Sequence, residues 1–184
     1  MMDEPTTLKE AIINWEEENQ LPISEAEIVS FQFQSPPIEK LDNSLAALAN
    51  CHTLSLSVNN IEKITGMYCL RNLRNLSLNK NYIKSFGGLE GVGDTLVHLQ
   101  LSYNFIERLK GIGVLRRLRF LDLSHNLVRE WSEFLKLREL PRLEELVFSG
   151  NQLQKYYEPL RWRDEVARKL PYLRKLDHEP IGYE

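Results

Sequence analysis

The chain has 184 residues, 42% of them hydrophobic and 27% charged, which is ordinary for a soluble globular protein and enough to bury one sizeable core. Its formal net charge of −3 combines residues 1–50, with 2 basic and 10 acidic side chains, and residues 51–184, with 21 basic and 16 acidic. These charges require neither a nucleic acid nor a membrane as partner, and no run of about 18 apolar residues predicts a transmembrane helix.

Residues 1–22 are expected to form a helical N-terminal cap. Thr7 and Glu10 have the spacing of a helix-capping box. Apolar residues then recur at helical spacing and predict one buried face, made of Leu8, Ala11, Ile12 and Trp15. We expect Trp15 to anchor this face in the core and Pro22 to end the helix. The acidic, polar first ten residues are unlike a secretory signal or a transit peptide.

Residues 28–153 carry a repeated pattern of an apolar residue, a leucine pair with one residue between, and an asparagine. The anchoring leucines of the five clear units stand 22, 23, 22 and 25 residues apart at Leu54, Leu76, Leu99, Leu121 and Leu146. This period predicts leucine-rich repeats. The fold class is then an α/β solenoid of about six repeats, with a parallel β-sheet on the concave face and short helices on the other.

A degenerate unit precedes the five clear ones. We expect its apolar residues to face inward at Ile28, Phe31, Phe33, Ile38 and Leu41. Pro36 replaces the asparagine in this unit. Departure from consensus is expected in a terminal repeat, because one side of it has no neighbour.

The repeated asparagine predicts how each turn closes. After each strand the chain bends inside the core, where its peptide groups have no strand partner. An asparagine amide offers one acceptor and two donors, and it can satisfy those groups where water cannot enter. We therefore expect a buried ladder made of Asn59, Asn81, Asn104, Asn126 and Asn151.

Residues 154–184 are expected to form a C-terminal cap, so that residues 1–184 make a single domain. Trp162, Val166 and Leu170 fall on one helical face before Pro171, and we expect Trp162 to be a core anchor. The segment LPYLRKLD keeps part of the repeat pattern and could add a seventh strand.

No catalytic, metal or cofactor site is expected in this chain. The segment GGLEGVGD lacks the Gly-Lys-Ser/Thr of a phosphate loop and is interpreted as a loop between repeats. The four histidines lack zinc spacing. Asp122, Ser124 and His125 lie along one strand and its exit, so they do not converge as a triad. Of the two cysteines, Cys51 holds an inward position, which fits a reducing, intracellular compartment.

The outward face of the sheet is the expected functional surface. Residues at equal offsets in successive repeats stack as neighbours. Early repeats place small polar residues there, whereas later repeats place aromatic and apolar residues inside a polar rim, which is typical of protein-binding patches. The predicted patch consists of His98, Gln100, Tyr103, Phe120, Asp122, His125, Glu145 and Val147. The alternative is a set of single exposed apolar residues, which are common on protein surfaces.

Basic residues divide into two groups. Arg74 and Arg119 flank strands, and we expect them to be solvated. A second group gathers near the C-terminal cap at Arg161, Arg163, Arg168, Lys169, Arg174 and Lys175. A solvated helix face is the simpler interpretation of this group, and contact with an acidic surface such as a microtubule is the alternative.

Several segments resemble the axonemal dynein light chain 1 family, and together they extend from Thr6 to about Asp177. They are TTLKEAIINWEEE, SEAEIVSFQFQSPPIEKLDNSLAALANC, GVGDTL, LSYNFIERLKGI and NLVREWSEFLKLRELPRLEELVF. The parts PPIEKLD and SYNFIE are the more specific ones. The chain departs from the family at Gln100 and Asp122, where bulky aromatic residues are usual, and at Gln152, where proline is frequent.

The resemblance implies a non-catalytic light chain of the outer dynein arm in the axoneme of a cilium or flagellum, within the cytoplasm and cytoskeleton. The implied partner is a dynein heavy chain, bound at its microtubule-binding stalk head through the sheet face around Tyr103, Phe120 and Val147. Such a light chain would modulate microtubule engagement and ciliary motility. Candidates for a direct tubulin contact are Arg161, Arg163 and Arg168. Neither a nucleic acid, a membrane nor a cofactor is implied.

The repeats alone leave two rival functions open. A phosphatase-1 regulator uses similar repeats of about 22 residues, usually in a longer array than this chain provides. A spliceosomal repeat protein has comparable size but binds a protein–RNA partner.

Overall fold

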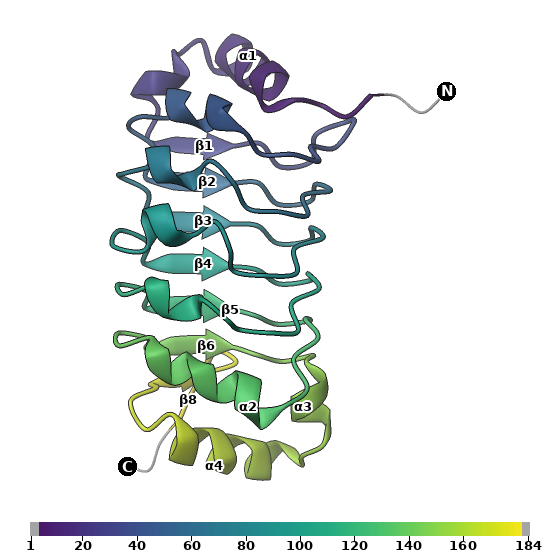
Figure 1. The fold of residues 1–184 in the computed structure, drawn as a ribbon, viewed down its shortest axis with the longest axis vertical. Coiled ribbons are helices and arrows are strands. Elements are labelled where there is room, and N and C mark those ends of the chain that lie inside the picture. The colour runs from purple at the N-terminus through teal and green to yellow at the C-terminus, as the bar shows by residue number, and fades with distance from the viewer. Residues whose placement is uncertain (1–3, 182–184) are drawn as a thin grey trace.

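Short strands stack in chain order along the long axis of the computed structural model, which describes residues 4–181 (Figure 1). They are β1 (Ile28–Ser30), β2 (Thr53–Ser55), β3 (Asn75–Ser77), β4 (His98–Gln100), β5 (Phe120–Asp122), β6 (Glu145–Val147), β7 (Lys175–Leu176) and β8 (Glu179–Pro180). β1 to β7 pair in parallel, and β8 returns antiparallel to β7. The predicted leucine-rich repeat solenoid is confirmed, and the partial repeat does add a seventh parallel strand.

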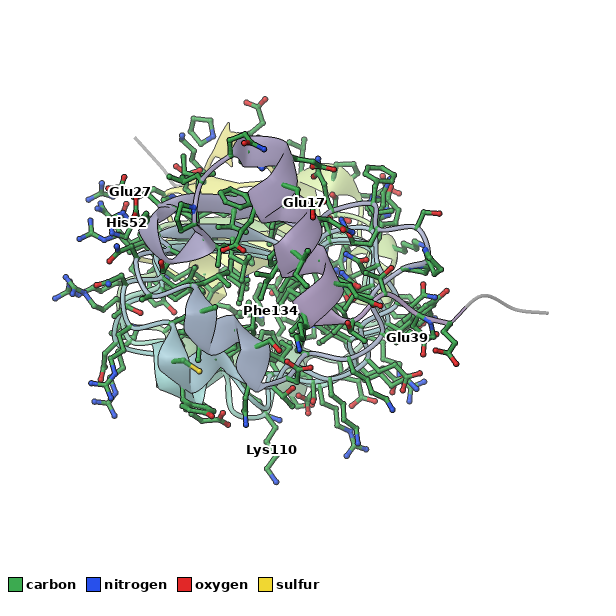
Figure 2. The ribbon with its side chains drawn as sticks, turned by 90° about the horizontal axis from the view of Figure 1, so that it is seen from above. Glu17, Glu27, Glu39, His52, Lys110 and Phe134 are labelled. Carbon is green, nitrogen blue, oxygen red and sulfur yellow. The ribbon has the colours of Figure 1, made fainter. Side chains whose placement is uncertain are left out.

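The core lies between this sheet and a second layer of short helices. The anchoring leucines of β2 to β6 are paired in register and are at most 2% exposed, so each strand buries its central residue. The 3-10 helices are η1 (Ile23–Glu25), η2 (Asn43–Ala47), η3 (Met67–Cys69), η4 (Glu90–Val92), η5 (Ile112–Val114) and η6 (Leu135–Glu139). Viewed along the long axis, Phe134 lies near the centre, with Glu27 and His52 at one edge and Glu39 at the other (Figure 2). Because alternate residues of a strand face opposite ways, the first and third residue of each strand are left outside.

Helices cover both ends of the solenoid (Figure 1). The α-helices are α1 (Leu8–Asn19), α2 (Trp131–Phe134), α3 (Gln152–Lys155) and α4 (Pro159–Lys169). In α1 the capping box is formed, because Thr7 Oγ1 accepts from the Glu10 amide at 3.2 Å and Glu10 Oε2 accepts from the Thr7 amide at 2.8 Å. The helix ends at Asn19, before Pro22, with Gln20 in the left-handed conformation. Trp15 packs against the core but is only partly buried.

The C-terminal end is closed by aromatic packing. Trp162 of α4 is 1% exposed, and its ring lies 5.6 Å from that of Phe148 and 5.5 Å from that of Trp131. Val166 and Leu170 are also fully buried. The outermost residues assigned to the two caps, 1–3 and 182–184, lie outside the described range. Within residues 4–181, no helix is both long and apolar enough to cross a membrane.

The five ladder asparagines lie inside the bends, at most 5% exposed. Asn104 is representative: its Oδ1 accepts from the Ile83 amide at 3.0 Å, and its Nδ2 donates to the carbonyls of Leu78 at 2.9 Å and Leu101 at 3.0 Å. The other four make the equivalent bonds. Each side chain thus joins its own turn to the preceding one.

The first repeat corrects one prediction, because its register differs from the expected one by two residues. Val29, rather than Phe31, pairs with Leu54. Phe31, Ile38 and Leu41 are buried as expected, but Ile28 is 70% exposed and Phe33 is 69% exposed. The segment IVSFQF contains apolar residues that fit either register, and Pro36 removes the asparagine that would have distinguished them.

Candidate functional site

The outward residues of β2 to β5 line a shallow hollow of about 470 Å³ on the sheet face. Small polar side chains of β2 and β3 line one part of it, and larger side chains of β4 and β5 line the other. The polar and aromatic lining residues are Thr53, Ser55, Asn75, Ser77, His98, Gln100 and Phe120. The structure therefore joins the early small residues and three of the eight predicted patch residues, His98, Gln100 and Phe120, into one continuous surface.

The small residues of the hollow bind one another. Asn75 Nδ2 donates to Thr53 Oγ1 at 3.0 Å, and the Ser77 hydroxyl shares a hydrogen bond of 2.7 Å with that of Ser57, a buried neighbour outside the hollow. A partner can cover such groups at a lower desolvation cost than free polar groups would impose. The floor is thus suited to contact with an apolar or helical surface.

A stacked aromatic pair follows the ends of β4 and β5, outside the residues that line the hollow. The rings of Tyr103 and His125 lie 4.2 Å apart and nearly parallel, at 10°. Lys80 Nζ lies 5.7 Å from the centre of the Tyr103 ring. These three residues and Val58 share a left-handed backbone, with φ between 53° and 58°. Gly150 continues the series, and a Cβ there would lie 2.5 Å from His125 Nδ1, so glycine makes room for the imidazole.

One member of the predicted patch differs from expectation, and two polar members are bound within the chain. Val147 is only 6% exposed, because the sheet continues past β6 into β7, so it does not project as an apolar contact. Asp122 Oδ1 accepts from the amide and hydroxyl of Ser124, at 2.9 and 2.6 Å. Glu145 pairs with Lys175 of β7 at 3.1 Å. The projecting part of the patch is therefore its β4–β5 half.

Sequence reasoning missed two exposed apolar residues, Ile28 and Phe33. Ile28 occupies the same outward column as Thr53, to which it is paired, so it extends the face beyond β2. Phe33 has φ 56° and takes the same left-handed position as Tyr103. With Ile28 near one end and Phe120 at the other, the polar hollow has apolar residues on both sides. The sequence did allow the register that exposes Ile28 and Phe33, since Val29 and Phe31 also have the spacing of the leucine pair.

The three candidate microtubule contacts have different environments. Arg161 is exposed and lies 5.9 Å from the Tyr157 ring, and Arg168 lies 3.4 Å from Glu165. Arg163 instead donates to three carbonyls of the β7–β8 hairpin, those of Leu176, Glu179 and Pro180. Arg163 is therefore a structural tie in this cap and is not free to meet a partner.

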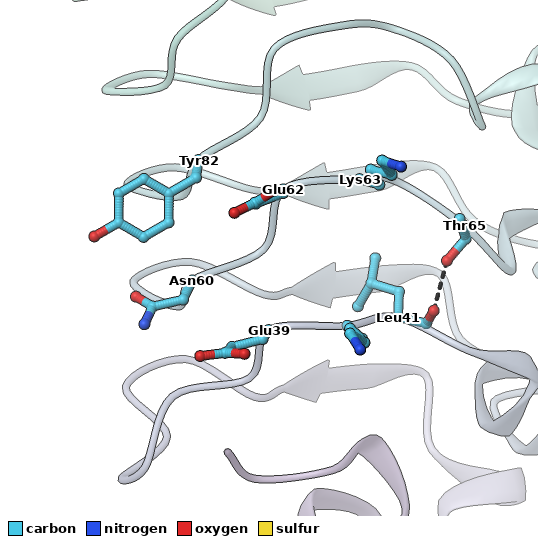
Figure 3. A pocket seen from close by; sticks show the side chains of 8 residues that line it. Glu39, Leu41, Asn60, Glu62, Lys63, Thr65 and Tyr82 are labelled. Carbon is cyan, nitrogen blue, oxygen red and sulfur yellow. Dashed lines mark hydrogen bonds between the residues drawn. The ribbon is translucent and has the colours of Figure 1, made fainter. Parts of the chain in front are cut away.

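A second hollow, of about 520 Å³, lies along the segments that run back from the ends of the strands toward η2 and η3 (Figure 3). Glu39 and Glu62 line it together with Lys40 and Lys63, and Thr65 Oγ1 donates to the Leu41 carbonyl at 2.5 Å. Both charge signs are balanced here, so the hollow favours neither a cation nor an anion. Among the described residues, no group of three or more His, Cys, Asp or Glu side chains is placed to hold a metal ion.

No family model matches the chain, but curated proteins do. Over 181 residues it is 58% identical to dynein axonemal light chain 1 of Homo sapiens, an alignment that covers 98% of this chain and 95% of the human protein. The same-named protein of Ciona intestinalis is 56% identical over 181 residues, 98% of this chain and 95% of its own. That of Chlamydomonas reinhardtii is 49% identical over 187 residues, covering 100% of this chain and 94% of its own.

Solved structures resemble the fold at lower identity. An LRR protein of Leptospira interrogans is 22% identical, with a TM-score of 0.60 over 80% of this chain and 36% of its own. An internalin of Listeria monocytogenes is also 22% identical, with a TM-score of 0.50 over 76% of this chain and 44% of its own. Matches at this identity establish the leucine-rich repeat fold and nothing more.

Proposed function

The chain belongs to the dynein axonemal light chain 1 family, and from that premise we propose that it is a non-catalytic light chain of an axonemal outer-arm dynein. It binds a dynein heavy chain at the stalk head and resides in the axoneme of a cilium or flagellum. The names of its relatives favour this function over a phosphatase-1 regulator or a spliceosomal protein.

The sheet face is the proposed contact, and its preformed hollow is the observation that carries the proposal. The face combines a polar floor, in which Asn75 binds Thr53, with an exposed Ile28 on one side and a half-buried Phe120 on the other. Surfaces of this kind pack helices with little ordering cost, because a sheet does not rearrange on binding. A helical element of the stalk head therefore fits across the hollow.

The C-terminal cap supplies the proposed second contact. Arg161 and Arg168 of α4 are exposed, whereas Arg163 is held by the hairpin. If the sheet face holds the stalk head, these two arginines bias how the head engages an acidic microtubule lattice. Coupling of about 1–3 kcal/mol is typical of such regulation.

Binding to a recombinant stalk head tests the sheet-face contact. Phe120→Glu places a charge in the hollow and is expected to weaken binding at least about tenfold, because central aromatic residues dominate interface energies. Affinity is measured by titration calorimetry with each purified variant. Thermal unfolding of the variant checks that its fold is retained.

Phe105→Glu is the matched control. Phe105 is 42% exposed, but it stacks on Tyr82, outside the sheet-face hollow. We expect this variant to bind as the wild type does. Equal affinity of all three proteins would remove the hollow from the contact, and absence of binding by the wild type would contradict the heavy-chain proposal itself.

A further inference from the structure

The turns that lead into the strands carry a concentration of arginines that the sheet-face contact does not use. In the four residues before β3, β5, β6 and β7 there are seven, which we call the arginine edge: Arg71, Arg74, Arg116, Arg117, Arg119, Arg142 and Arg174. The equivalent turns before β2 to β7 contain only two carboxylates, Asp94 and Glu144. Positive charge therefore accumulates there although the whole chain has a net charge of −3.

The solenoid lines these side chains up. The residue before each strand donates its backbone amide to the carbonyl of the corresponding residue one repeat earlier, at 2.8 to 2.9 Å. The series runs backward along the chain, each residue donating to the next: Arg174, Glu144, Arg119, Val97, Arg74 and His52. Strand-preceding residues therefore form one column along the edge of the sheet. In Figure 2 this is the edge that His52 marks, where blue nitrogen tips extend outward.

Two hollows open along this column. The first, of about 190 Å³, is lined by His52, Arg71, Asn72, Arg74, Thr95, Val97 and Arg117, with no carboxylate among them. The second, of about 360 Å³, is lined by Arg119, Pro141, Arg142, Leu143, Glu144, Tyr172 and Arg174. Six of the seven arginines thus line a concave surface rather than projecting singly into solvent.

Few of these guanidinium groups are neutralised within the described residues. Arg119 holds Glu144 through two hydrogen bonds at 2.8 and 2.9 Å, and Arg116 lies 3.9 Å from Asp94. The other five have no ion pair among residues 4–181. Repeats about 4.8 Å apart bring like charges within the Debye length of about 8 Å at physiological salt. Apart from the contacts with Glu144 and Asp94, these charges repel one another, so most of the arrangement does not stabilise the fold.

We propose that the arginine edge binds an acidic polypeptide segment in an extended conformation. The Arg119–Glu144 pair shows the mode of recognition, since Arg119 Nη2 donates to both oxygens of the Glu144 carboxylate in a charge-assisted contact. The unneutralised arginines on both sides of it offer the same kind of contact to carboxylates of a partner. This surface is separate from the sheet-face hollow, so the two contacts can be made together.

The chemistry of the edge favours a peptide over a nucleic acid. Single-stranded nucleic acids are held by aromatic side chains on which bases stack. The first hollow has no Phe, Tyr or Trp, and its one aromatic ring is that of His52. Tyr172 in the second hollow donates its hydroxyl to the Leu137 carbonyl at 3.0 Å. The acidic residues before β1, Glu25 and Glu27, also end the positive surface at its N-terminal side.

The length of the edge sets the size of the segment. Four steps of about 4.8 Å separate β3 from β7, or about 19 Å, which an extended chain covers in about six residues. A run of consecutive acidic residues presents carboxylates on both sides of its backbone. The segment therefore needs many closely spaced carboxylates, but it does not need one fixed alignment with the arginines.

Fluorescence anisotropy with a labelled octaglutamate peptide tests the proposal on the full chain. The wild type is expected to bind in about 0.1 M salt, where the Debye length is about 10 Å, and to lose binding in about 1 M salt, where it is about 3 Å. Arg74→Glu combined with Arg117→Glu should weaken binding at least about tenfold, because two positive charges that attract the peptide are replaced by negative charges that repel it. Neither side chain makes a hydrogen bond within the described residues, so thermal unfolding should be unchanged.

Lys84→Glu combined with Lys110→Glu is the charge-matched control. Both lysines are exposed and line a different surface, with Lys110 on the helix face (Figure 2). We expect this variant to keep its affinity within about twofold. Equal loss in both variants, absence of binding, or tighter binding of an oligothymidylate of the same length would overturn the proposal. So would self-association at low salt that the arginine substitutions abolish, because the occupant would then be a second copy.

Discussion

Asn104 illustrates how single side chains hold the repeats together. It is 4% exposed and bonds to one amide and two carbonyls, in its own turn and the preceding one. Without the carboxamide, the Ile83 amide and the Leu78 and Leu101 carbonyls lose a partner inside the core. A buried polar group without a partner costs about 1–3 kcal/mol.

We therefore expect Asn104→Ala to lower the free energy of unfolding by about 1–3 kcal/mol, measured by urea denaturation. Asn60→Ala is the control, because Asn60 lies beside a ladder position and its side chain makes no hydrogen bond within residues 4–181. Its effect should stay within about 0.5 kcal/mol. Equal effects of the two substitutions would contradict a specific role for the ladder.

At the scale of elements, Glu133 ties α2 to the preceding repeat. Its Oε2 accepts from the Leu109 amide at 2.8 Å and pairs with Lys136 at 2.8 Å. Burial raises the pKa of the Glu133 carboxyl, but the hydrogen bonds from Lys136 and Leu109, with the charges of Lys136 and Arg108, outweigh it, so the pKa lies below its ordinary value of 4.5. The tie is therefore strongest when the carboxyl is ionised.

A pKa lowered by folding gives stability that is present above the unfolded pKa and is lost as the pH falls through the folded pKa. We expect Glu133→Gln to reduce the free energy of unfolding at pH 7, and the difference from wild type to shrink as the pH falls below 4.5. Urea denaturation across this range measures it. Glu130→Gln, at an exposed residue whose side chain makes no hydrogen bond within the described chain, should show no such trend. If the free energies of unfolding of Glu133→Gln and wild type differed by the same amount at every pH, the stabilising role of the ionised Glu133 carboxylate would be contradicted.

For the whole molecule, an open solenoid must cover its two ends. Trp162 closes the C-terminal end within a cluster of rings: Trp131, Phe134, Phe148 and Tyr157 lie 5.5 to 6.1 Å from it. Its Nε1 has no hydrogen-bond partner in the described chain, so it stabilises by packing alone.

Trp162→Ala should lower the free energy of unfolding by about 3–5 kcal/mol, because it leaves a large cavity over the last repeat. Trp162→Phe should cost less, since it keeps an aromatic ring and removes the N–H that lacks a partner. Leu160→Ala, at a residue that is 80% exposed on the same helix, serves as the control and should stay within about 0.5 kcal/mol. Urea denaturation of the three variants measures these differences. Similar values for Trp162→Ala and Leu160→Ala would show that the helix does not seal the core.

The repeat spacing was enough to predict the solenoid, because the leucines and asparagines are local signals whose roles do not depend on distant residues. The site was predicted less well. His98, Tyr103, Phe120 and His125 do lie on the sheet face, but the small residues that complete the hollow carry no sequence signal of binding. Only the register of the strands places Ser55 and Ser77 in the same hollow as Phe120.

The sequence by itself determined the period, the buried leucines and the family of this protein, since each depends on residue identity at fixed spacing. Tertiary structure alone decided which of two registers the first repeat takes, and so exposed Ile28 and Phe33. It also buried Val147, committed Arg163 to a hairpin, and aligned the seven arginines along one edge. The reason is physical: these outcomes depend on which segments are in contact across repeats. The spacing of neighbouring residues does not determine contacts between residues more than twenty positions apart.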